Sequence, residues 1–132
     1  MNEKIHTFTI GSEDIDANRH MNNARYNVHF DAARVEFFNG TGFSVDSLTE
    51  RGLGFFIPKK GPTRYFRQTF EGDFLTITTK FQKYDGENKV VTLQRMFRGE
   101  DIVSREDSTY VIVGLDDGKG REIPEDLIAK IV

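Results

Sequence analysis

The stretch from about His20 to Asn39 most constrains the fold, because its helical periodicity places two apolar stripes on one helix. At about 100° per residue, the first stripe consists of Met21, Ala24, Val28, Ala32 and Val35, and the second of Tyr26, Phe30, Ala33 and Phe37. A helix on a protein surface usually carries a single apolar stripe. The pattern therefore predicts a long helix that is buried on two sides and ends at Gly40 and Gly42.

Much of the remaining chain has the β-branched and aromatic residues typical of strands. We predict strands over Lys4–Ile10, Leu53–Ile57, Tyr65–Phe70, Phe74–Tyr84, Val90–Arg98 and Ile102–Leu115. Pro58 and Pro62 are expected to interrupt the second of these regions, and Pro124 to begin a short helix through Ile131. Hairpin-linked strands combined with one long helix predict an α+β fold with an antiparallel sheet.

Length and composition narrow the class of protein. A chain of 132 residues fits one domain, which we expect to span residues 1–132. The absence of Cys excludes disulfides and thiolate metal sites. A net charge of −3 with interspersed acids and bases argues against nucleic-acid binding. The chain shows no signal peptide and no apolar run near the roughly 18 residues of a membrane span, so we expect a cytoplasmic protein that does not enter a membrane.

A cluster of polar residues lies just before the predicted helix, in the run DIDANRHMNNARY. It contains Asp14, Asp16, Asn18, His20, Asn22 and Asn23. One such residue is enough to cap the helix by accepting hydrogen bonds from its first turn. The alternative is chemistry: the helix N-terminus carries about half a positive charge and free N–H donors that can polarise a carbonyl. A nearby carboxylate can then attack that carbonyl or activate water, which favours acyl transfer to water.

The same run resembles the signature of the hotdog-fold acyl thioesterases, in which Asp-x-Asp is followed by His-x-Asn-Asn-x-x-Tyr and a long helix. The part from Asp16 to Asn23 is especially similar to plant and bacterial acyl-carrier-protein (acyl-ACP) thioesterases, whereas the 4-hydroxybenzoyl-CoA thioesterase group shares the Asp but has a less similar tail. The segments FEGDFLTITTKF and STYVIVGLDDGKGREIPEDL also resemble the family, so the resemblance spans nearly the whole chain. Arg19 stands where many bacterial members have Gly, and this departure leaves the substrate open.

The resemblance implies a hotdog fold, in which five or six antiparallel strands wrap one long central helix. It also implies hydrolysis of an acyl-CoA or acyl-ACP thioester, with Asp16 as general base or nucleophile and His20 and Asn18 in support. We predict that the backbone N–H of Asn23 binds the thioester carbonyl, and that Asn22 and Tyr26 contact the substrate. No cofactor is expected. No metal is expected either, because His20 and His29 lie on opposite helix faces.

Two further expectations concern the surface. Lys59, Lys60, Arg64 and Arg67 form a basic patch that either protects an edge strand or receives CoA phosphates or the acidic face of acyl carrier protein. The resemblance also implies dimers or tetramers with the acyl site between subunits. We therefore expect a homodimer or homotetramer, with the stripe Tyr26, Phe30, Ala33 and Phe37 covered by the second subunit.

Two other functions stay open. Hotdog-fold hydratases have a motif resembling Asp-x-Asn-Pro-x-His. The run from Asp16 to His20 lacks that Pro and is one residue shorter, which would rotate the His relative to the Asp. A non-catalytic acyl-binding or oligomerisation module is the third interpretation, although such a module would not need both Asp16 and His20.

Overall fold

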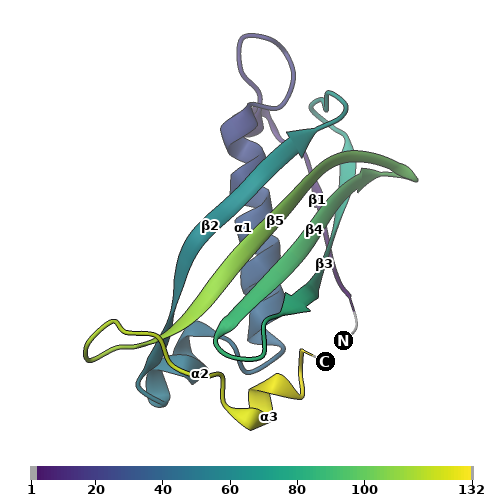
Figure 1. Ribbon diagram of the computed structural model, residues 1–132. Helices are drawn as coiled ribbons and strands as arrows, with labels where there is room; N and C mark the ends of the chain where they lie inside the picture. The colour runs from purple at the N-terminus through teal and green to yellow at the C-terminus, as the bar shows by residue number, and fades with distance from the viewer. Residues whose placement is uncertain (1–2, 132) are drawn as a thin grey trace.

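The structure is a computed structural model and describes residues 3–131. Its elements in chain order are β1 (Lys4–Thr9), a short 3-10 helix η1 (Ser12–Asp14), α1 (Asn23–Asn39), α2 (Val45–Glu50), β2 (Leu53–Tyr65), β3 (Phe74–Tyr84), β4 (Lys89–Arg98), β5 (Asp101–Gly114) and α3 (Glu125–Ile128). The strands form one antiparallel sheet in the order β1-β3-β4-β5-β2, and α1 lies along one face of it (Figure 1). The predicted α+β architecture is confirmed.

The central helix begins slightly later than the sequence pattern suggested. Asn22 is the N-cap, and its side chain accepts a hydrogen bond from the Ala24 N–H at 2.8 Å. Residues 20–22 belong to the preceding loop, because Met21 forms a β-bridge with Ile15 and its N–H donates to the Thr69 carbonyl at 2.8 Å. The helix ends at Asn39 with Gly40 as C-cap, as predicted.

The prediction for β2 is wrong in two respects. The strand continues through Pro58 and Pro62 instead of stopping, because both prolines fall where the pairing with β5 shifts register. A sheet edge tolerates proline at such irregular positions, where no ladder hydrogen bond is lost. The predicted strand Tyr65–Phe70 does not form beyond Tyr65, and the sequence analysis did not find α2. The last helix is shorter than predicted and covers only Glu125–Ile128.

The prediction of which helix stripe faces a second subunit also needs correction. The aromatic stripe Tyr26, Phe30, Ala33 and Phe37 is buried inside the chain against its own sheet. The other stripe is open: Val28 is 44% exposed and Val35 59% exposed, while only Met21 is buried. Burying the larger aromatic side chains removes more apolar surface from water. The sheet therefore covers the aromatic stripe and leaves the stripe of Ala and Val residues exposed.

The core consists of two apolar clusters along α1. One surrounds Phe30 and includes Met21, Leu75 and Met96, and the other surrounds Phe38 near α2 and α3.

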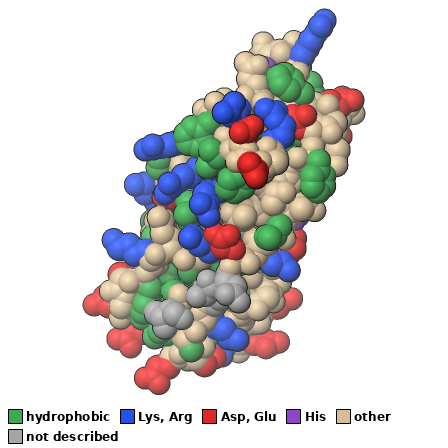
Figure 2. Space-filling view, turned by 90° about the vertical axis from the view of Figure 1, so that its right-hand side faces the viewer, with side chains coloured by type: hydrophobic (Ala, Val, Ile, Leu, Met, Phe, Trp, Pro, Cys, Tyr) green, Lys and Arg blue, Asp and Glu red, His purple; other side chains and the backbone are tan. Residues whose placement is uncertain are grey.

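The surface carries side chains of mixed type. On the side seen in Figure 2, acidic and basic side chains are interspersed and hydrophobic ones form small separate groups. No helix within residues 3–131 is long and apolar enough to cross a bilayer.

Candidate active site

The polar cluster forms a tight loop at the N-terminus of α1. The bridge between Ile15 and Met21 closes this loop. Inside it, the Arg19 N–H donates to the Asp16 carbonyl at 2.9 Å and the Asp16 N–H donates to the His20 carbonyl at 3.4 Å. Arg19 has φ = 65°, a left-handed conformation that glycine adopts without strain and other residues seldom do. The loop therefore has the turn geometry that a Gly would favour at this position.

Both carboxylate oxygens of Asp16 are held within this loop. Oδ1 accepts from the backbone N–H of Asn18 at 2.8 Å, and Oδ2 accepts from the side-chain amide of Asn22 at 3.2 Å. Asn22 uses its own Oδ1 to cap α1, so one amide joins the carboxylate to the helix N-terminus. The structure thus brings Asp16, Asn18 and Asn22 together. His20 contacts Asp16 only through the backbone, and its ring Nδ1 lies 3.3 Å from the Met21 carbonyl oxygen.

A small pocket of about 170 Å³ opens beside the helix N-terminus. Its lining residues are His20, Met21, Asn23, Tyr26, Tyr65, Phe66, Arg67 and Gln68. Four predicted site residues, His20, Asn23, Tyr26 and Arg67, therefore share one pocket. Asp16, Asn18, Asn22, Lys59, Lys60 and Arg64 do not line it.

Asn23 is the first residue of α1 and lines this pocket. The N–H groups of Ala24 and Arg25 donate to the side chain and the carbonyl of Asn22. Within residues 3–131, no hydrogen bond is found from the Asn23 N–H. A free N–H at a helix N-terminus is suited to stabilise negative charge on an oxygen. Asn23, for which a role as carbonyl donor was predicted, lines this pocket.

Two tyrosines form the wall of the pocket opposite the loop. The Tyr26 hydroxyl lies 2.9 Å from Thr69 Oγ1, and the Tyr65 hydroxyl donates to the Asn23 carbonyl at 3.4 Å. Their rings meet edge to face at 4.9 Å. Burial raises the pKa of both hydroxyls, so each keeps its proton at neutral pH. Tyr26 is only 3% exposed and therefore acts mainly as a packed wall.

The role of Asp14 was not predicted from the sequence. Its carboxylate is buried and accepts hydrogen bonds from Arg25 Nε at 2.8 Å, His29 Nε2 at 2.9 Å and the Gly11 N–H at 3.1 Å. Burial by itself would raise the pKa of Asp14, but these hydrogen bonds together lower it below the ordinary value. Arg25 and His29 stand four positions apart on one helix face, a spacing that could have indicated a shared acidic partner.

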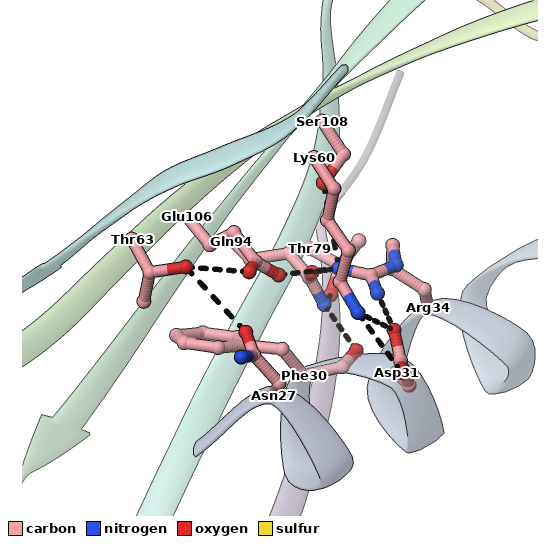
Figure 3. A network of polar contacts seen from close by, with 10 residues as sticks. All are labelled: Asn27, Phe30, Asp31, Arg34, Lys60, Thr63, Thr79, Gln94, Glu106 and Ser108. Carbon is pink, nitrogen blue, oxygen red and sulfur yellow. Dashed lines mark hydrogen bonds and ion pairs between the residues drawn. The ribbon is translucent and has the colours of Figure 1, made fainter. Parts of the chain in front are cut away.

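A second polar network, also missed, lies in the core halfway along α1 (Figure 3). Arg34 Nη1 donates to Glu106 at 2.5 Å and to Gln94 at 2.7 Å, and both partners are buried. Gln94 in turn donates to the Phe30 carbonyl at 2.9 Å. This network ties the middle of α1 to β4 and β5. Within the described chain, no group of three or more His, Asp or Glu lies close enough to hold a metal ion.

Lys60 belongs to the outer part of this network. Its Nζ lies 2.9 Å from a carboxylate oxygen of Asp31, which also pairs with Arg34 (Figure 3). Lys60 is therefore turned toward α1 and away from the pocket at the helix N-terminus. Lys59 and Arg64 are exposed on β2, so the structure does not gather the four basic residues at one entrance.

The five-stranded antiparallel sheet on one central helix is the hotdog fold, and solved structures share it closely. A hypothetical protein of Staphylococcus aureus, SAV2348, described in complex with CoA, has a TM-score of 0.90 at 23% identity, covering 98% of this chain and 82% of that one. A probable thioesterase from Bartonella henselae gives 0.81 at 23% identity, with coverage of 93% and 100%. A 1,4-dihydroxy-2-naphthoyl-CoA thioesterase from Synechocystis gives 0.85 at 12% identity, with coverage of 98% and 96%.

Sequence comparison places the chain in a family. The model of the thioesterase-like superfamily matches residues 10–131, and the chain belongs to that superfamily. No curated protein matches it significantly. Family membership supports thioester hydrolysis as the general chemistry.

Proposed function

We propose that this protein hydrolyses an acyl thioester carried by CoA or by acyl carrier protein, at the N-terminus of α1. The free N–H of Asn23 beside the pocket is the observation that carries the proposal. It supplies a donor where the carbonyl oxygen gains negative charge during attack. Membership of the thioesterase-like superfamily supports the same reaction.

In the proposed reaction, Asp16 acts as general base or as nucleophile. As a base, its carboxylate takes a proton from water while the water oxygen bonds to the thioester carbon. The carbonyl electrons move onto the oxygen that faces the Asn23 N–H. The oxyanion then collapses, the carbon–sulfur bond breaks, and the thiolate leaves and takes up a proton. Hydrogen bonds from Asn18 and Asn22 hold the carboxylate in one orientation, and His20 at the pocket is placed to position the water or the substrate.

The pocket of one chain is smaller than a typical ligand site. A ligand pocket typically measures roughly 300–1,000 Å³, whereas the pocket at the helix N-terminus holds about 170 Å³ and Asp16 does not line it. We therefore propose a homodimer or homotetramer, in which a second chain completes the site. The exposed stripe of α1, with Val28 and Val35, supports this proposal because open apolar surfaces of this kind commonly mark interfaces.

The deciding experiment measures thiol release from a panel of acyl-CoA and acyl-carrier-protein thioesters of different chain length. We expect hydrolysis of at least one class. Hydration of an enoyl-CoA without hydrolysis would select the hydratase instead. Binding without any turnover would select the acyl-binding module and contradict the proposed activity.

A further inference from the structure

Three arginines lie side by side on neighbouring strands of the sheet. Arg64 of β2 is paired in register with Arg105 of β5, and Arg105 is paired in register with Arg95 of β4. Residues that are directly opposite on neighbouring strands project from the same face of a sheet. These three residues therefore form a continuous arginine row across three strands.

The arginine row lies on the outer face of the sheet, which points away from α1. Glu106 and Gln94 stand next to Arg105 and Arg95 in their strands, and both join the polar network with α1 on the inner face. Because successive side chains of a strand alternate between the two faces, Arg105 and Arg95 project outward, and Arg64 follows them by its register. This outer face is turned toward the viewer in Figure 1, with α1 behind it.

Strand pairing alone does not favour such a row. Neighbouring strands lie about 4.8 Å apart, so the row spans only about 10 Å. Like charges that are directly opposite on neighbouring strands are destabilising. A bound anion would convert this repulsion into attraction.

Two carboxylates neutralise part of this charge. Asp107 accepts a hydrogen bond from Arg105 Nε at 3.2 Å, and Glu3 accepts one from Arg95 Nη2 at 2.8 Å and lies 3.7 Å from Lys80 Nζ. Within residues 3–131, no ion pair is found for the third arginine. The three arginines and Lys80 against two carboxylates leave a local charge of +2, on a chain whose net charge is −3. Ion pairs that are open to solvent are weak, so a multivalent anion can replace them.

Arg95 also has an unused hydrogen-bond donor. Within the part of the chain that the structure describes, its Nε atom is buried and has no hydrogen-bond partner. A buried donor without a partner costs free energy. The guanidinium group presents its N–H donors as a fork that matches the oxygens of phosphate. A phosphate between Arg95 and Arg105 would offer an acceptor to this donor once the side chain turns toward it.

The residues directly beside the row limit the size of the ligand. They are uncharged or acidic: Asp107, Leu93, Ile102, Phe97 and Thr78. A long polyanion that ran along the strands would leave the arginines after one contact and meet the Asp107 carboxylate or apolar side chains. A compact anion with two or three phosphates covers the row without reaching them.

From these observations we propose that the arginine row is a binding site for a compact phosphate anion, namely a diphosphate or triphosphate group. The site lies on the face of the sheet opposite to α1, and its ligand need not take part in thioester hydrolysis. The group could belong to free pyrophosphate, to a nucleotide or to CoA, which also carries a diphosphate.

Calorimetric titration of the parent protein in a metal-free buffer of low ionic strength tests the site directly. Pyrophosphate and triphosphate should bind with one saturable site per chain, and monophosphate should bind at least about tenfold more weakly. Added salt should weaken binding, because the site is open to solvent. Pyrophosphate should also raise Tm, since the unfolded chain does not hold the three arginines together. Absence of saturable binding by both anions would overturn the proposal.

Substituting the middle of the row separates a built site from general surface charge. Arg105→Gln should weaken pyrophosphate binding about tenfold or more. It should not lower Tm without the anion, because it also removes contacts between like charges. Arg64→Gln, at an exposed position of the edge strand, should weaken binding in the same way.

The matched control is Arg51→Gln, which removes the same charge from an arginine near the opposite end of β2 that is paired with Asp126. This control should bind pyrophosphate as the parent does. If Arg51→Gln and Arg105→Gln weaken binding equally, the anion responds to overall charge and the proposed site does not exist.

Comparing pyrophosphate, ADP and CoA on the parent and on Arg105→Gln identifies the source of the phosphate. If the substitution weakens CoA and pyrophosphate binding by the same factor, the row holds the diphosphate of CoA. If it weakens pyrophosphate and ADP but leaves CoA unchanged, the row takes a separate ligand. A single-stranded oligonucleotide that binds more tightly than triphosphate and depends on Arg105 would replace the proposal with nucleic-acid binding. Pyrophosphate binding by a protein that hydrolyses no thioester would retain this site and contradict only the proposed function.

Discussion

Asp14 and Asp16 stand two residues apart but have different surroundings. Asp14 is buried and binds two side chains of α1, Arg25 and His29. Asp16 is half-buried in the loop and accepts hydrogen bonds only from neutral amides. The first carboxylate therefore anchors the loop to the helix, while the second keeps the local freedom that a reacting group needs. A resemblance to a known motif was required to choose Asp16, because both carboxylates precede the same helix.

Replacing Asp16 by Asn tests its catalytic role. Asn retains the size of the side chain and an oxygen that can accept from Asn18, so the fold should survive. The loss of the proton acceptor or nucleophile should lower kcat by about 100-fold or more. Steady-state kinetics on the best substrate measure the effect, with Asp101→Asn, at an exposed residue of β5, as the matched control. Hydrolysis at the parental rate by the Asp16→Asn protein would remove Asp16 from the mechanism.

Replacing Asp14 by Asn should affect stability instead of chemistry, and the effect should depend on pH. Because the folded pKa of Asp14 is lowered, its contribution is fully present above the ordinary Asp pKa of about 3.9 and is lost as the pH falls through the folded pKa. At pH 7 we expect the Asn variant to be less stable by about 1.5–3 kcal/mol. Urea unfolding at pH 5 and pH 3 should show this difference shrinking at the lower pH. A constant difference would mean that the charge of Asp14 does not matter.

At the scale of elements, a buried ion pair joins α1 to the sheet. Arg34 and Glu106 are both nearly inaccessible, and Gln94 joins them to the carbonyl of Phe30 (Figure 3). Arg34 lies outside both apolar stripes of the helix, so the helical periodicity did not indicate that it is buried. The structure buries it instead, because β5 supplies an acidic partner that periodicity within the helix cannot reveal.

Substituting this pair one residue at a time and then together tests the coupling. Glu106→Leu leaves a buried guanidinium without its main partner and should cost about 3–5 kcal/mol. The double variant with Arg34→Met removes both charges and should recover a large part of that loss. Chemical denaturation gives the four free energies of unfolding. If the two single costs simply add in the double variant, the pair is not coupled and does not hold α1 in place.

At the scale of the whole molecule, the exposed stripe of α1 is an apolar surface that a single chain does not cover. Val28 and Val35 lie on the open side of the helix while the aromatic stripe is packed inside. The two-stripe pattern indicated burial on two sides, but it could not say which stripe the chain's own sheet would cover. We therefore propose the same assembly with the opposite stripe, which includes Val28 and Val35, at its interface.

Introducing a charge on this stripe tests the assembly. Val28→Glu would place an unpaired carboxylate in an apolar interface, which is unfavourable. We expect the oligomer to dissociate and hydrolysis to be lost, while circular dichroism retains the secondary structure. Ile5→Glu, at a residue of β1 that is 60% exposed, is the matched control. Sedimentation at micromolar concentration provides the measurement, and a fully active parent protein with the mass of one 15.2 kDa chain would exclude a shared site.

Features that depend on neighbouring residues could be predicted from the amino-acid sequence. Short-range periodicity and turn chemistry predict the long helix with its glycine stop, the strands β3, β4 and β5, and the turns between these strands. The polar loop around Asp16 could also be recognised from the sequence, because the hydrogen bonds of the Asp16 carboxylate join residues at most six positions apart.

Features that depend on residues far apart in the chain became apparent in the folded structure. Arg34 pairs with Glu106, which lies 72 positions away, and β2 runs through two prolines because β5 supports it on one side. The choice between the two helix stripes likewise depends on which side chains the folded sheet brings into contact. Short-range patterns do not reveal such contacts, because the free energy gained by burying a side chain depends on neighbours that only the completed fold supplies.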